Sequence, residues 1–158
     1  MIKLPMDTSA STLAFSKGEP NYMLHEASRV KPPFQVISDL IYYDRNALGE
    51  VDKNSQTPLH IAIENHASFR VIEHLMKEFP EAAGMCDDRG KNPLMLLCEN
   101  YPMHSEDEFM ELSGILISAS SRSVTVEDKT GCNALEYAII NNVGEQALDF
   151  LQLQAKIR

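Results

Sequence analysis

Apolar residues recur at helical spacing in short segments along the chain. Around residue 60, Leu59, Ala62 and Ile63 fall on one helical face, because residues three and four apart are neighbours there. Thr57 can cap this helix, and Pro58 suits its first turn, where no backbone N–H is needed. The pattern predicts a turn followed by a short helix beginning after Thr57.

The same pattern returns at a fixed distance. Leu24 and Leu94 stand 35 residues before and after Leu59, and Leu135 stands 41 residues beyond Leu94. The intervening segments repeat as well: Phe34, Val36, Ile37, Leu40, Gly49 and Asp52 correspond to Phe69, Val71, Ile72, Leu75, Gly84 and Asp87 at a spacing of 35. Self-similarity at a fixed period is the signature of a tandem repeat.

Each repeat unit is expected to contain a turn, a short inner helix and a second, outer helix. In the first unit the helices are predicted near residues 21–29 and 34–43. The third unit is six residues longer, and the extra length is placed at 101–108, where Pro102 stops the inner helix. The acidic residues 106–108 suit a helix N-terminus, although a solvated loop is the simpler interpretation. The last outer helix is predicted near 145–154.

The repeated turn and inner helix resemble the ankyrin repeat family. The residues that carry the resemblance are Asp52, Thr57, Pro58, Leu59, His60 and Ala62, then Asp87, Gly90, Pro93 and Leu94, then Asp128, Gly131, Leu135 and Ala138. The sequence departs from the family pattern at Ser55, in place of the turn glycine, at Leu97, in place of a small alanine, and at Ala134, in place of proline.

The resemblance implies an all-α fold, an ankyrin-type solenoid of about four helix-turn-helix repeats with short turn or hairpin connections. We expect a loose N-terminal leader over residues 1–18 and a repeat domain over 19–158, with units at about 19–51, 52–86, 87–127 and 128–158. In this family the histidine of the turn-helix segment is structural and bonds across neighbouring turns, so His25 and His60 are expected to do so rather than catalyse.

The composition limits the class of partner. The formal net charge is −9 at pH 7, which repels phosphate backbones, argues against nucleic acid and favours a protein with a basic patch. The acidity also serves solubility without any partner. No apolar run approaches the ~18 residues that a membrane span needs. The oligomeric state stays open.

The sequence offers no clear catalytic or metal-binding set. Cys86, Cys98 and Cys132 lack the paired spacing of a zinc site and are expected to be reduced, buried or half-buried thiols. The seven glycines are scattered, which excludes a glycine-rich phosphate loop. Residues 1–17 lack the features of a signal peptide, which favours an intracellular, cytoplasmic location. We therefore expect no catalytic residue, cofactor or metal.

The expected function is non-catalytic protein binding through the turn tips and the concave face of the inner helices. The candidate binding residues are Lys53, Asn54, Gln56, Glu64, Asn65, Arg89, Lys91, Glu99, Asn100, Lys129, Thr130 and Asn141. Two alternatives remain open. The chain is a structural subunit buried permanently in a larger assembly, or it is a regulatory repeat domain that accompanies an enzyme, with Cys132 as the reactive candidate.

Overall fold

The computed structural model describes residues 22–157, and every regular element in this range is a helix. The eight α-helices are α1 (Met23–Arg29), α2 (Phe34–Tyr43), α3 (Pro58–Glu64), α4 (Phe69–Glu78), α5 (Pro93–Glu99), α6 (Glu106–Ala119), α7 (Ala134–Ile140) and α8 (Glu145–Lys156). Short 3-10 helices lie in the connections: η2 (Arg45–Leu48), η3 (Pro80–Gly84), η4 (Tyr101–Met103) and η5 (Ser121–Val124). The leader expected over residues 1–18 lies outside the described residues.

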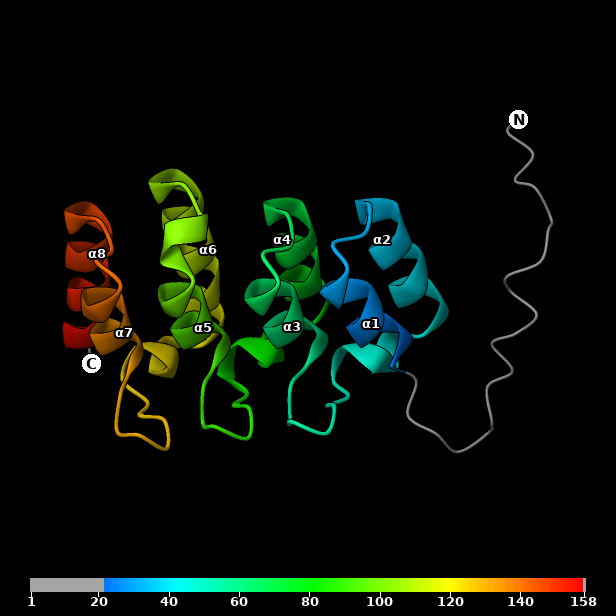
Figure 1. Ribbon diagram of the computed structural model, residues 1–158, viewed down its shortest axis with the longest axis horizontal. Helices are drawn as coiled ribbons and strands as arrows, with labels where there is room; N and C mark the ends of the chain where they lie inside the picture. The colour runs from blue at the N-terminus through cyan, green and yellow to red at the C-terminus, as the bar shows by residue number, and fades with distance from the viewer. Residues whose placement is uncertain (1–21, 158) are drawn as a thin grey trace.

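The helices form two rows, as Figure 1 shows. The short inner helices α1, α3, α5 and α7 make one row, and the longer outer helices α2, α4, α6 and α8 make the other. A hairpin loop projects at the same end of the molecule before each of α3, α5 and α7. Within each row a helix packs on its neighbours, so the predicted all-α solenoid of four helix pairs is confirmed.

Side-chain caps explain where three of the inner helices begin. Thr57 and His60 form a reciprocal capping box at α3, in which the His60 ring accepts from the Thr57 N–H. At α5, Asn92 stands in the position of that threonine and accepts from the Met95 N–H at 3.0 Å. Asn133 and Glu136 form a second capping box at α7. Each cap satisfies backbone donors that the first turn leaves without an intrahelical partner.

The core lies between the two rows and continues from unit to unit. Leu59, Leu94 and Ala134 are at most 2% exposed on successive inner helices. Leu97 is fully buried, although it stands where the repeat pattern has a small alanine. The buried residues of neighbouring units form one cluster, so each unit is stabilised chiefly by the units beside it.

The insertion of the third unit becomes a short 3-10 helix followed by an early start of α6. Ser105 caps α6 by accepting from the Glu108 N–H at 3.2 Å. Residues 106–108 form the exposed first turn of α6, so the interpretation of this run as a loop is wrong. The alternative is confirmed, because negative charge is favourable beside the positive end of the helix dipole.

Candidate protein-binding site

One aspartate organises each of the three hairpin tips. Its Oδ1 atom accepts from the backbone N–H groups two and four residues further on, which holds the turn closed. The N···O distances are 2.8 and 3.0 Å for Asp52, 2.9 and 2.8 Å for Asp87, and 2.8 and 3.1 Å for Asp128. The three tips therefore share one backbone geometry.

Backbone hydrogen bonds join the tips to one another. The Asp88 N–H donates to the Asn54 carbonyl at 2.9 Å, and the Lys129 N–H donates to the Arg89 carbonyl at 3.0 Å. These bonds link three turns that are separated in sequence into one continuous ribbon. Side chains carried by the ribbon are consequently held at fixed spacing.

The glycines at two tips show how closely neighbouring tips approach each other. Gly90 and Gly131 both have φ of +83°, where a Cβ atom is unfavourable, and Ser55 occupies the same turn position at +59°. A Cβ on Gly90 would lie 3.0 Å from the Lys129 nitrogen and 3.1 Å from the Asp128 Cα, whereas a Cβ on Gly131 would meet nothing within 4 Å.

We therefore expect Gly90→Ala to destabilise the protein more than Gly131→Ala. The conformational penalty of about 1–2 kcal/mol applies to both substitutions, and only Gly90→Ala also pushes two tips apart. Urea unfolding of the two variants measures the difference. Equal losses of unfolding free energy would show that the tips are not held together as described.

Polar side chains beneath the tips couple them to the ends of the inner helices. Glu64 accepts from Gln56 Nε2 at 2.8 Å and from Arg89 Nη2 at 3.0 Å. Both carboxylate oxygens of Glu99 lie 2.8 Å from Lys91 Nζ. Each glutamate is thus fixed by a tip side chain of its own unit, and Glu64 also by the next tip.

Two of the predicted tip residues are not free. Gln56 and Lys91 are only 5% and 8% exposed, in contrast to the expectation that they project from the tips. Their side chains fold back over the inner helix to reach Glu64 and Glu99. They position the binding surface rather than form its exposed part.

The pairing of Lys91 continues into the fourth unit. Lys91 Nζ lies 4.5 Å from the centroid of the Tyr137 ring, whose hydroxyl donates to Asp128 Oδ2 at 2.6 Å. Burial raises the pKa of Tyr137, and its bond to the carboxylate raises that pKa further. Burial alone would raise the pKa of Asp128, but the donors Tyr137 and Thr130 outweigh it and lower that pKa. Sequence reasoning did not single out Tyr137, which takes the register of Ile61 and Leu96 in the second and third units.

Arg89 and the three asparagines also have structural partners. Burial lowers the pKa of Arg89, but its bonds to Asp87 and Glu64 outweigh burial and raise that pKa, so the guanidinium stays charged. Each asparagine donates to a carbonyl four residues back at 2.9 Å and closes its inner helix: Asn65, Asn100 and Asn141. These four side chains are held in place before any partner arrives.

The exposed part of the surface is therefore smaller than predicted. Lys53, Lys129 and Thr130 are exposed, and Asn54 is half-buried. Neither Lys53 nor Lys129 takes part in any of the ion pairs among residues 22–157. These two ammonium groups, on the first and last tips, are available to a partner.

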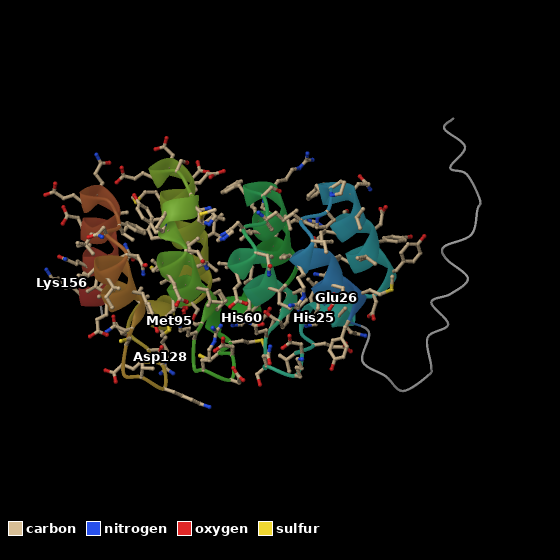
Figure 2. The ribbon with its side chains drawn as sticks, in the orientation of Figure 1. His25, Glu26, His60, Met95, Asp128 and Lys156 are labelled. Atoms are coloured by element: carbon tan, nitrogen blue, oxygen red, sulfur yellow. The ribbon has the colours of Figure 1, made fainter. Side chains whose placement is uncertain are left out.

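The two repeat histidines join their inner helices to the segment that leads into or forms the next tip. Figure 2 shows His25, His60 and Met95 at one level on successive inner helices. His60 Nδ1 accepts from the Thr57 hydroxyl at 2.7 Å, and Nε2–H donates to the Met85 carbonyl at 3.2 Å. His25 Nε2 lies 3.1 Å from the carbonyls of Glu50 and Gln56. Their predicted structural role is confirmed.

Stability should fall as the pH decreases below 6.5. Burial lowers the pKa of His25, His60, His66 and His104 below the ordinary histidine value of 6.5. Below pH 6.5 the unfolded chain then binds more protons than the folded chain, so the free energy of unfolding decreases with pH. Urea unfolding at pH 7.5, 6.5 and 5.5 tests this; an unchanged free energy over that range would contradict it.

In the part of the chain that the structure describes, the cysteines and other ligand-type residues do not assemble into a metal site. Cys98 is buried, Cys132 is half-buried and Cys86 is exposed, so the expectation of a buried or half-buried thiol is wrong for Cys86. Partial desolvation of its sulfur and the adjacent Asp87 carboxylate raise the pKa of Cys86, and burial raises the pKa of Cys98; both shifts disfavour the nucleophilic thiolate. Among residues 22–157, no three His, Cys, Asp or Glu side chains group as metal ligands. No helix in that range is long and apolar enough to cross a membrane.

Comparison with known proteins agrees with the repeated architecture. Residues 45–97 match the family described as ankyrin repeats (many copies). The sequence matches none of the curated proteins. The matched segment covers the second unit and the start of the third, and the same tip, inner helix and outer helix recur through α8. Residues 45–97 therefore match ankyrin repeats, and the helix pairs on either side of this segment have the same arrangement.

Proposed function

We propose that this protein binds another protein, without catalysis, through the tips and the adjoining ends of the inner helices. We call this surface the tip strip. Its partner-facing residues are Lys53, Asn54, Glu64, Asn65, Arg89, Glu99, Asn100, Lys129, Thr130 and Asn141, and Gln56 and Lys91 support them from below. Ankyrin repeats are generally modules of protein–protein interaction and are typically non-catalytic.

The observation that carries the proposal is that the tip strip is ordered before binding. The backbone bonds between tips and the pairing of Glu64 and Glu99 fix its polar groups in place. A surface that is already rigid loses less side-chain entropy on association, so more of the contact energy appears as affinity.

The charges of the tip strip define the chemistry of the partner. Glu64 and Glu99 keep 36% and 38% of their side chains exposed, while Lys53 and Lys129 stand at the two ends. A partner that offers a basic patch to the glutamates, with carboxylates on either side of that patch, complements this order. The net charge of −9 also speeds the encounter with a basic surface.

The double variant Lys53→Glu, Lys129→Glu tests the proposal. It changes two exposed charges that make no ion pair, so the fold should persist while affinity for a partner isolated with the wild-type chain falls about tenfold. Reversing the charges of Glu64 and Glu99 is less suitable, because the buried Lys91 would lose its carboxylate partner.

The matched control is Arg122→Glu, Lys156→Glu, which changes the net charge equally on exposed residues near the end of α8. The control should bind within about twofold of wild type. Equal weakening by both pairs would remove the tip strip as the binding site. Association that survives high salt and dilution would instead indicate a permanently buried subunit.

A further inference from the structure

The outer-helix side carries an apolar groove that the tip strip does not use. It lies between α4 and α6, which are neighbours in the outer row (Figure 1), and has a volume of about 830 Å³. Phe69 and Met76 of α4 line one side of the groove, and Met110 and Ile115 of α6 line the other. The aromatic ring of Phe150 on α8 also lines it. We call this the α4–α6 groove.

A glycine keeps the α4–α6 groove open. Gly114 lies in the middle of α6 and lines the groove, and a Cβ atom built on it would meet nothing within 4 Å. Glycine inside a helix costs roughly 1 kcal/mol relative to alanine, and the packing here does not require it. The absence of a side chain at Gly114 therefore leaves open space at the surface. It does not serve to bring two helices close together.

The rim of the groove carries more acidic than basic side chains. Glu73 and Lys77 pair with each other at 2.8 Å across one edge. Glu111 lies on the opposite edge, is exposed, and takes part in none of the ion pairs among residues 22–157. Asp107, one turn earlier on α6, is also exposed and outside those pairs. A ligand with apolar groups in the groove and cations beside them would complement this rim.

We propose that the α4–α6 groove binds an amphipathic helix of a protein partner, with an aliphatic face flanked by lysine or arginine. Residues 110–119 of α6 extend about 14 Å at 1.5 Å per residue, which accommodates side chains at positions i, i+3 or i+4, and i+7 of a docked helix. Met110 is half-buried and can adapt to different aliphatic side chains, since the methionine side chain is unbranched and flexible, whereas Met76 is 2% exposed and forms the floor of the groove.

The negative charge of the rim and of the whole chain argues against two other occupants of the groove. An anionic membrane surface would be repelled by the acidic rim and by the net charge of −9. A second copy of this chain would bring the same acidic charge to the groove. None of the tip-strip residues lines the groove, so this inference stands or falls independently of the proposed tip strip.

The test uses a fluorescent, amidated helical peptide of about 14 residues with leucine at i, i+3, i+4 and i+7 and lysine at the remaining polar positions. Gly114→Trp fills the groove and should weaken binding at least about tenfold, whereas the single methyl group of Gly114→Ala occupies less of the groove and should weaken binding less than the tryptophan does. Both side chains enter open space, so both variants should keep the wild-type melting temperature or exceed it. Unchanged affinity of the tryptophan variant would overturn the proposal.

Two further measurements separate specific docking from general attraction to an acidic protein. The ε-methyl signals of Met76 and Met110 should shift on peptide addition, while that of the exposed Met103 on η4 should not. A peptide with glutamate in place of lysine should bind at least about tenfold more weakly. A shift confined to Met103, equal binding of the acidic peptide, or self-association that Gly114→Trp abolishes would each contradict the proposed occupant.

Discussion

Replacing His60 with alanine should cost about 2–4 kcal/mol of unfolding free energy, because it removes a fully buried ring and leaves the Met85 carbonyl without its donor. Met85 lies just before the second tip, so the lost bond is one that joins α3 to the segment leading into the next tip. Chemical denaturation of His60→Ala measures the effect.

The outer-helix histidine provides the control for this substitution. His74 makes an edge contact with Phe34 at 5.0 Å between ring centroids and is only half-buried. His74→Ala should therefore cost about 1 kcal/mol or less. If the two alanine variants are equally stable, the bond from His60 to the Met85 carbonyl is not the structural link described above.

The Lys91–Glu99 pair should respond asymmetrically to loss of either partner. Glu99→Ala leaves an ammonium group whose side chain is only 10% exposed without its carboxylate, which should cost about 2–3 kcal/mol. Lys91→Met leaves a carboxylate that is 38% exposed and can be solvated, so it should cost about 1 kcal/mol or less. Urea unfolding of the two single variants and of the double variant Lys91→Met, Glu99→Leu gives the comparison.

The double variant also identifies the cause of the loss. Replacing both partners by apolar groups of similar volume is often neutral, so it should recover most of the stability that Glu99→Ala loses. Equal costs for both single variants would indicate that the pair behaves as an ordinary exposed ion pair.

The repeat register was sufficient to predict the helix pairs, and the family resemblance supplied the role of the histidines. Residues 35 apart, such as His25 and His60, occupy equivalent places because every unit packs on its neighbours in the same way. The predicted outer helix over 34–43 agrees with α2 for the same reason.

The register could not predict how long polar side chains are oriented. Gln56 and Lys91 each reach a glutamate eight residues further along, and that distance becomes short only after the tip folds over the inner helix. Tyr137 was likewise missed, because its partners Lys91 and Asp128 are brought to it by two different tips. The α4–α6 groove depends on the gap left at Gly114, which a periodic pattern does not reveal.

Amide hydrogen exchange of the protein alone and in complex with its isolated partner tests the central claim most directly. We predict that binding slows exchange in the three tips, at residues 52–57, 87–92 and 128–133, and at the adjoining ends of α3 and α5. Protection confined to α4 and α6, with the tips unchanged, would contradict binding through the tip strip.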